Sequence, residues 1–341
     1  MDRVEKALHA VDLSGRGLEV GPSYNPLVPK SSGHRIETVD HAHAEELVAK
    51  YTAMGLSEEH IARIEPVDHL WAGGSLLDVV PDHGSYDYIL ASHFIEHTVD
   101  LVRFLKDCEV LLRDGGRLSL VVPDKRFCFD RFQPLSTVGD VIDAYHAKNT
   151  FHTAGPLVDH QAYACTSGGA LIWSADHRAP VELQFPNLEG AAEAARNGLA
   201  QQAYFDTHRW KFTPTSFELL IDDLAVMGLH SFGVVESLPT EGFEFFVTLG
   251  NGTPRSEPRK RVTTLQVIED ELAQTASDEP SPGTGAEIRR QADVLREQNA
   301  RLEQDNVRLE QEITELRAST SWRLTAPLRS VVTRLRGHRA G

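Results

Sequence analysis

The stretch that decides the fold, Tyr86–Asp124, reads YDYILASHFIEHTVDLVRFLKDCEVLLRDGGRLSLVVPD. Its first six residues, Tyr86–Ala91, form an apolar run typical of a buried strand. Val99–Leu112 follows with apolar residues at helical spacing, and the pair Gly115-Gly116 is expected to stop that helix. Arg117–Val122 then alternates as a second strand and ends at a proline. A strand, a helix and a second strand in this order predict a parallel pair joined by a crossover.

The same alternation extends over about the first 250 residues. Further strands are predicted at Arg16–Gly21 and Arg35–Asp40, and an antiparallel pair at Ser231–Glu236 and Gly242–Leu249. Helices are predicted at Ala42–Met54, at Gly190–Gln202, and after Thr213-Pro214, a helix cap followed by a first-turn proline. We therefore predict an α/β domain over residues 1–250, with a mostly parallel sheet covered on both faces and an inserted substrate or lid region over 125–205.

The composition excludes several classes of protein. The 341 residues carry a formal charge of −16, which excludes a protein that coats nucleic acid through bulk positive charge. The three cysteines are not closely spaced, and an odd number argues against a disulfide framework. We find neither a signal-peptide pattern nor a run of about 18 apolar residues, so we expect a cytoplasmic protein.

The Tyr86–Asp124 stretch resembles the class I S-adenosylmethionine-dependent methyltransferases. In that family the corresponding segment forms the fourth strand, a Glu-His turn, a helix, a Gly-Gly turn and the fifth strand. The resemblance covers roughly Leu13–Leu249. It implies a Rossmann-like, seven-stranded methyltransferase sheet, methyltransferase activity, and S-adenosylmethionine as the cofactor.

The resemblance also implies a cofactor site at the carboxyl ends of the strands, where open α/β sheets bind ligands. The glycine after the first strand lets the backbone approach the cofactor, and the nearby acid faces its methionine part. Later acids are expected to bind the ribose hydroxyls and the adenine amino group, and residues after the fourth strand border the sulfonium. The residues predicted to bind the cofactor are Glu19, Gly21, Asp40, Asp68 and Ser92.

The first loop departs from the family pattern. Gly21-Pro22-Ser23-Tyr24-Asn25-Pro26 stands where the family has Gly-x-Gly-x-Gly. Because Pro22, Pro26 and Pro29 do not fit together inside a regular helix, we predict that the first crossover is largely loop. A degenerate domain, retained as a scaffold and no longer binding the cofactor, is the alternative.

Histidines and charged residues supply the candidate chemistry for the methyl acceptor. A hydroxyl acceptor benefits from a base that titrates near neutral pH, as histidine does. The candidate catalytic residues are His93, His97 and His208. Lys125 and Arg126 suit an anionic acceptor such as a nucleotide-sugar or a lipid phosphate. The residues predicted to bind the acceptor are Glu96, Asp124, Lys125 and Arg126.

A rival motif overlaps the same stretch. His93-Phe94-Ile95-Glu96-His97 has the H-x-x-E-H spacing of inverted zinc peptidases, whose two histidines bind the metal from one helical face. That chemistry needs the motif inside a helix and a third ligand on another helix. Here the motif directly follows a predicted strand, so we predict no metal ligands, and a zinc hydrolase remains the remote alternative.

The C-terminal part has a different composition. Residues 251–285 are rich in proline, glycine and charge, and are predicted to be a flexible linker, with a short helix at Thr264–Ala273. Residues 286–318 carry a heptad pattern, with Ile288, Leu295, Leu302, Leu309 and Leu316 at d and Ala292, Asn299, Asn306 and Ile313 at a. This pattern predicts a coiled coil, as a homodimer or with a hetero-partner such as a glycosyltransferase. A single solvated helix is the alternative.

Residues 319–341 hold five arginines and no acid, which leaves a charge of −21 on the preceding residues. This basic amphipathic tail suits either an anionic membrane surface, here the inner membrane, or a protein partner. Its first part, ASTSWRLTAPLR (Ala318–Arg329), is similar to a terminal pattern of bacterial glycosyltransferases and companion enzymes of surface-polysaccharide assembly. That resemblance implies O-methylation of a sugar of O-antigen or capsule, on a glycan or on a nucleotide- or lipid-linked sugar.

Overall fold

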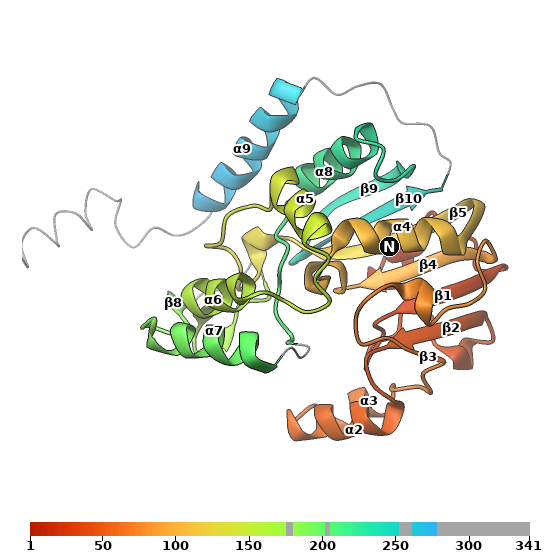
Figure 1. The fold of residues 1–341 in the computed structure, drawn as a ribbon, viewed down its shortest axis with the longest axis horizontal. Coiled ribbons are helices and arrows are strands. Elements are labelled where there is room, and N and C mark those ends of the chain that lie inside the picture. The colour runs from red at the N-terminus through yellow and green to blue at the C-terminus, as the bar shows by residue number, and fades with distance from the viewer. Residues whose placement is uncertain (175–179, 202–204, 252–260, 278–341) are drawn as a thin grey trace, which may run out of the picture. The chain divides into compact units, whose positions relative to one another are not determined.

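Seven strands form the central sheet of the computed structural model (Figure 1). From one edge to the other they are β3 (His69–Leu70), β2 (Arg35–Asp40), β1 (Arg16–Val20), β4 (Tyr86–Ser92), β5 (Leu112–Pro123), β10 (Glu244–Gly250) and β9 (Gly233–Glu241). The first five are parallel, and β10 is antiparallel to both β5 and β9. The predicted α/β fold, with its closing antiparallel pair, is confirmed.

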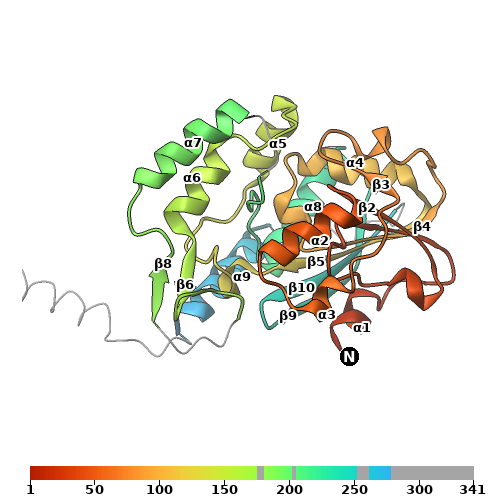
Figure 2. The ribbon, with the colours of Figure 1, turned by 90° about the horizontal axis from the view of Figure 1, so that it is seen from below.

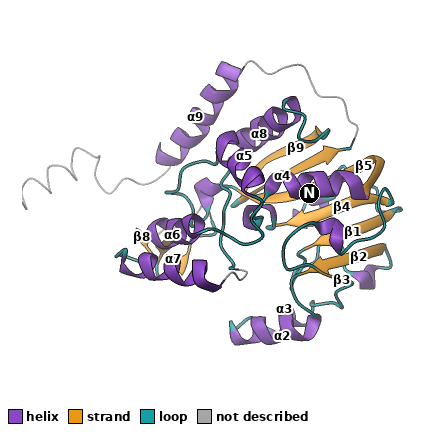
Figure 3. Cartoon of the chain, viewed as in Figure 1, coloured by secondary structure: helices purple, strands orange, loops and turns teal. Residues whose placement is uncertain are grey.

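The structure describes residues 1–174, 180–201, 205–251 and 261–277. The helices of these ranges are α1 (Arg3–Ala7), α2 (Ala44–Ala53), α3 (Glu58–Ile61), α4 (Leu101–Leu111), α5 (Val138–Ala147), α6 (Ala154–Tyr163), α7 (Glu189–Gln201), α8 (Pro214–Val226) and α9 (Arg261–Ser277). Single 3₁₀ turns are η1 (Lys30–Ser32), η2 (Leu76–Asp78), η3 (Ile95–His97) and η4 (Lys125–Phe127). Figure 3 distinguishes these helices from the strands of the sheet by colour.

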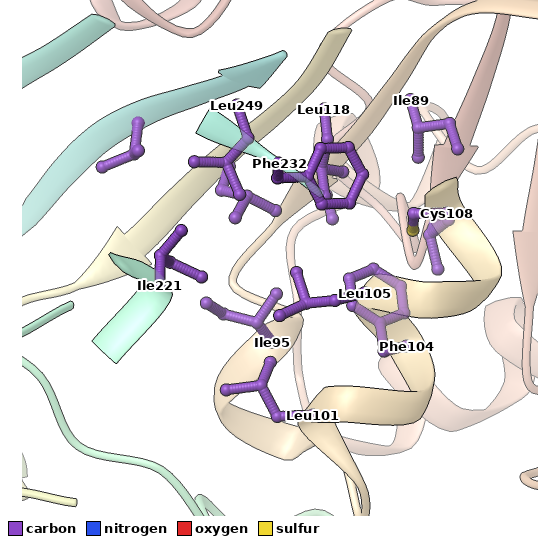
Figure 4. Packing of buried hydrophobic residues seen from close by; sticks show 14 of the residues in the cluster. Ile89, Ile95, Leu101, Phe104, Leu105, Cys108, Leu118, Ile221, Phe232 and Leu249 are labelled. Carbon is purple, nitrogen blue, oxygen red and sulfur yellow. The ribbon is translucent and has the colours of Figure 1, made fainter. Parts of the chain in front are cut away.

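Both faces of the sheet are buried, as the apolar strands predict. On β4, Ile89 points into a cluster with α4 and α8, whereas its neighbours Tyr88 and Leu90 point into a cluster on the opposite face. This alternation follows from the two-residue period of a strand. Figure 4 shows the first cluster, in which Leu105 of α4 packs beneath the sheet near Leu118 of β5.

The opposite face is covered by α1 and by the first crossover. Leu27 and Val28 of that crossover pack with Ala7 and Tyr88. Between β1 and β2 the only regular element is the 3₁₀ turn η1, so the proline-rich first crossover is largely loop, as predicted.

The strand β5 begins earlier than the sequence predicts. We expected Gly115-Gly116 to end the preceding helix, but α4 ends at Leu111 and both glycines lie within β5. Leu112 already pairs with Tyr86 of β4, and the register shifts before Arg117 pairs with Tyr88. The glycines therefore accommodate an irregularity of the strand, with Gly115 at a φ of 74°.

The inserted region adds its own helices and a small sheet to the domain. It contains α5, α6, α7 and the three-stranded sheet β7-β6-β8, whose strands are Ala170–Leu171, Cys165–Ser167 and Val181–Leu183. In Figures 1 and 2, α6 and α7 lie beside the central sheet and cover neither of its faces. The chain then returns to the sheet, because Lys125 N donates to Phe212 O (2.9 Å).

Part of the predicted flexible linker is an ordered helix. Within 251–285, α9 is longer than the expected Thr264–Ala273 helix, and it packs against the domain. Thr264 and Ile268, one turn apart, are buried, and Arg126 Nη1 donates to Glu271 O (3.0 Å). The coiled coil predicted over 286–318 and the tail over 319–341 lie outside the described residues. Among the described helices, none is long and apolar enough to span a membrane.

We expect Leu105→Ala to lower the free energy of unfolding by about 2–5 kcal/mol, because it leaves a cavity at a fully buried position between α4 and the sheet. Val110→Ala, on the same helix but 43% exposed, is the matched control and should change it by less than about 0.5 kcal/mol. Chemical denaturation of both variants measures this, and equal effects would contradict the described packing of α4.

Candidate functional site

A cavity of about 810 Å³ opens beyond the carboxyl ends of β1, β2 and β4. The strand order reverses between β1 and β4, which is where open α/β sheets bind ligands. The volume of the cavity falls within the range of about 300–1,000 Å³ that is typical of small-molecule sites. Residues of the sheet ends line one side, and residues of the inserted region line the other.

Gly21 and Asp40 lie at the strand ends where the sequence predicts them, and both line the cavity. Gly21 has a φ of 69°, and a Cβ there would come within 2.8 Å of the Phe94 ring. Asp40 is buried, and its two carboxylate oxygens accept from Ser23 N (3.0 Å) and His41 N (2.7 Å). A carboxylate held in this way at the end of the second strand is oriented to accept further hydrogen bonds from a ligand.

Glu19 has a different role from the one expected. It does not line the cavity, because its carboxylate accepts from Leu27 N (2.6 Å) and Val28 N (3.2 Å) of the first crossover. These two bonds fold the proline-rich loop back onto β1. Burial raises the pKa of Glu19 to about 7, and the two backbone donors only partly oppose this rise.

Asp68 also lies outside the cavity lining. It precedes β3 and is therefore on the wrong side of a parallel strand, since the cavity borders the carboxyl ends. Its carboxylate pairs with Lys30 Nζ (2.6 Å) and accepts from Thr38 N (2.8 Å). The residue that follows β3 and lines the cavity is Trp71, which sequence reasoning missed.

Ser92 and His93 both line the cavity, at the end of β4. His93 has a φ of 49°, an unusual conformation for a residue other than glycine and one that is often found at functional sites. Its Nε2 lies 2.7 Å from Glu244 Oε2. Arg3 also contacts Glu244 (2.8 Å), and its Nη2 donates to Ser92 Oγ (2.8 Å). Helix α1 and strand β10 thus fix both predicted residues.

Glu96, His97 and His208 come together on the cavity wall, although His208 is more than a hundred residues further along the chain. The rings of His97 and His208 meet edge to face, 4.6 Å between centroids. His208 Nδ1 donates to Asp130 Oδ2 (2.5 Å). Burial opposes the charged form of His208, but Asp130 and Glu96 outweigh burial and raise its pKa. Burial, with the neighbouring histidines, holds the pKa of His97 well below its ordinary value.

The three charged residues after β5 are not in the cavity. Asp124 and Arg126 form a buried ion pair (2.6 Å), and Lys125 Nζ donates to Arg131 O (2.8 Å). A buried charge is expensive unless it is paired, so these side chains are used within the fold. The prediction that they bind the acceptor is therefore not supported by their positions.

The aromatic residues of the inserted region were also missed. Phe129 and Trp173 line the cavity, and their ring centroids lie 5.1 Å apart. The ring centroids of Trp173 and His93 lie 5.7 Å apart. The aromatic-rich segment DKRFCFD, which includes Phe129 and Asp130, was a usable signal. Nothing local in the sequence indicated Trp173.

We expect the stability of the wild type relative to Glu19→Gln to fall by up to about 3 kcal/mol as the pH rises from about 5 to about 8. The folded pKa is about 7 against an ordinary 4.5, so in this window the folded protein binds a proton that the unfolded chain releases. Urea denaturation across this pH range measures the difference. A difference that grows with pH would contradict the assigned direction of the shift.

The chain is similar to known proteins in part of its sequence and in its fold. Residues 38–120 match a family model described as a methyltransferase domain. Solved structures similar to the chain include S-adenosylmethionine-dependent methyltransferases from Aquifex aeolicus (12% identity, 73% of this chain and 89% of that chain, TM-score 0.35) and Mesorhizobium loti (12%, 72% and 97%, TM-score 0.36). Another is such an enzyme from Thermotoga maritima (16%, 73% and 87%, TM-score 0.34). No curated protein matched.

The family match runs from the second half of β2 through β3, β4 and α4 to most of β5, and this stretch supplies many of the residues that line the cavity. The match to a methyltransferase-domain model agrees with the strand order of the sheet and with the cavity at its reversal.

Proposed function

We propose that the chain O-methylates a sugar in the biosynthesis of bacterial cell-surface polysaccharide, O-antigen or capsule, with S-adenosylmethionine as methyl donor. The observation that carries the proposal is that one cavity is lined by two sets of residues. Gly21 and Asp40, which follow β1 and end β2, form what we call the cofactor side; histidines, among them His93 after β4, and aromatic rings form what we call the acceptor side.

The cofactor side is preorganised. Asp40 and Glu19 each accept backbone hydrogen bonds from the first loop, so the loop has a defined path despite its prolines. Gly21 has a positive φ and lets the Phe94 ring approach the backbone, and both residues line the cavity. This construction favours a domain that still binds its cofactor over the degenerate scaffold that the proline-rich loop suggested.

The acceptor side suits a sugar. Phe129, Trp173 and Phe243 line the cavity, and the C–H face of a sugar can pack on aromatic rings. His93 and His97 offer polar atoms to hydroxyl groups, and His93 is fixed by Glu244 as a base would need to be. Methyl transfer is an in-line displacement, so holding the acceptor in line with the cofactor's methyl group is the main task of the protein.

The partners belong to the same proposal. The tail pattern at Ala318–Arg329 favours a cytoplasmic enzyme that acts on a glycan or on a nucleotide- or lipid-linked sugar. We propose that residues 286–318 pair with a second copy or with a glycosyltransferase, and that residues 319–341 contact the inner membrane.

For the cofactor, we expect calorimetry to show binding of S-adenosylmethionine to the wild type and at least tenfold weaker binding to Asp40→Ala. Two hydrogen bonds from ribose hydroxyls to a carboxylate are worth about 1.5–3 kcal/mol each. Asp68→Ala is the matched control, because Asp68 is an acid beside a neighbouring strand but outside the cavity, and it should bind nearly as the wild type does. Absence of binding by the wild type would overturn the proposed function.

For the product, we expect glycan from cells that lack the protein to lose O-methyl groups while its chains are still made. Complementation with the wild type should restore the methyl groups, and complementation with Asp40→Ala should not. Mass spectrometry and methyl NMR of the purified polysaccharide measure this. Altered chain length with methylation intact would instead support the scaffold.

A further inference from the structure

We propose that Glu96, His97 and His208 form a site for one divalent transition-metal ion on the acceptor side of the cavity. The three residues come from two distant segments, the turn η3 and the chain that returns from the inserted region. One potential ligand atom of each lies within 4.8 Å of those of the other two. Ligand atoms about 2.0–2.2 Å from a shared ion are about 3–4 Å apart, so a small contraction would close the site.

The ring of His208 has a carboxylate behind it. His208 Nδ1 lies 2.5 Å from Asp130 Oδ2, so this ring presents its Nε2 to an ion. His97 Nε2 lies 3.8 Å from Glu96 Oε1, and its Nδ1, 3.2 Å from Asp206 Oδ1, makes no hydrogen bond among the described residues. Metal-ligating histidines almost always donate their other ring N–H to a carboxylate, a carbonyl or water, which orients the ring.

The carboxylate of Glu96 is the second, independent observation. The residue is fully buried, and neither carboxylate oxygen has a hydrogen-bond partner among the described residues. Its nearest ring nitrogens, on His93 and His97, are 3.6 and 3.8 Å away, beyond hydrogen-bonding distance. Arg209 N (2.7 Å) and Trp210 N (3.2 Å) donate to the Glu96 carbonyl, so its backbone is fixed. A buried carboxylate without hydrogen bonds is costly, and a bound cation would offset that cost.

The ligand set indicates the class of ion. Two imidazoles and one carboxylate suit Zn²⁺ and its first-row neighbours better than Mg²⁺ or Ca²⁺, which prefer oxygen ligands alone. Three protein ligands leave a coordination position open, as in catalytic sites. All three residues line the cavity. If the proposed function holds, such an ion would orient an acceptor hydroxyl and favour loss of its proton.

This set differs from the H-x-x-E-H motif of the inverted zinc peptidases. Residues Ile95–His97 form a single 3₁₀ turn, and His93 directs its Nε2 to Glu244 (2.7 Å). The second histidine of the site is therefore His208. Sequence reasoning placed His208 among the catalytic candidates and predicted no metal ligand.

The test uses the full-length protein without a histidine tag, freed of metal by a chelator, and titrated with Zn²⁺ alone. We expect calorimetry to show one ion per chain for the wild type. Glu96→Gln and His208→Ala should bind at least tenfold more weakly. His83→Ala, an exposed histidine outside the cavity, should bind as the wild type does. Co²⁺ in place of Zn²⁺ should give visible absorption bands in the wild type that both ligand variants lose.

A folding check on Glu96→Gln and two further variants, Asp130→Asn and His93→Ala, separate the loss of a metal ligand from a general loss of structure. Glu96→Gln removes a buried charge while keeping the shape, so the metal-free variant should be folded, which a thermal melt checks. Asp130→Asn keeps every ligand but loses the carboxylate behind His208, and should bind about 10- to 100-fold more weakly. His93→Ala should retain the ion.

The site is overturned if the wild type binds no ion, if His208→Ala retains binding, or if His93→Ala loses it. None of these titrations contains S-adenosylmethionine. If the wild type binds Zn²⁺ but not S-adenosylmethionine, the proposed function is overturned and the metal site stands. If it binds S-adenosylmethionine but not Zn²⁺, the metal site is overturned and the proposed function stands.

Discussion

The crossovers that leave β1 and β4 run to opposite faces of the sheet, and the rest of the molecule depends on this divergence. Leu27 and Val28 of the first crossover pack beneath Tyr88, whereas α4 packs on the other face against Ile89. No crossover covers the strand ends between them, so a crevice opens there. Gly21, Asp40 and His93 reach this crevice because each directly ends or follows one of the strands that border it.

Two buried carboxylates fix the path of the first loop in this chain. In many dinucleotide-binding domains a glycine-rich turn that opens a helix fixes this loop instead. Glu19 holds the first loop against β1 and Asp40 holds it against β2, in each case through backbone N–H groups. Such hydrogen bonds replace those of a regular helix, which the prolines of the loop prevent. The cofactor side of the cavity is thus preorganised by side chains, at the cost of burying two acids.

The side of the cavity that we propose binds the acceptor is built largely by the inserted region and by the segment that rejoins the sheet after it. Lys125 N bonds Phe212 O, and Ser136 N bonds Lys211 O. These backbone bonds fix the segment that carries His208 beside η3. The buried Asp124–Arg126 pair lies at the root of the same junction, where Arg126 also reaches α9. Asp124 and Arg126 therefore stabilise this junction although neither residue lines the cavity.

The sequence by itself determined the elements and the residues at strand ends. Alternating or helically spaced apolar residues predicted β4, α4 and β5, and the Thr213 cap predicted α8, because these patterns depend on neighbours along the chain. Gly21, Asp40 and Ser92 could be expected at the cavity because each ends or follows a predicted strand and because the resemblance to the class I methyltransferases implies a ligand site there. Only the tertiary structure decided which way the other side chains point. Glu19 accepts hydrogen bonds from the first loop, and Asp124 pairs with Arg126, because a buried charge without a partner is costly. Asp68 precedes β3 and pairs with Lys30, away from the carboxyl ends of the strands. The meeting of Glu96 and His97 with His208 also required the fold, because no local pattern records a contact across more than a hundred residues.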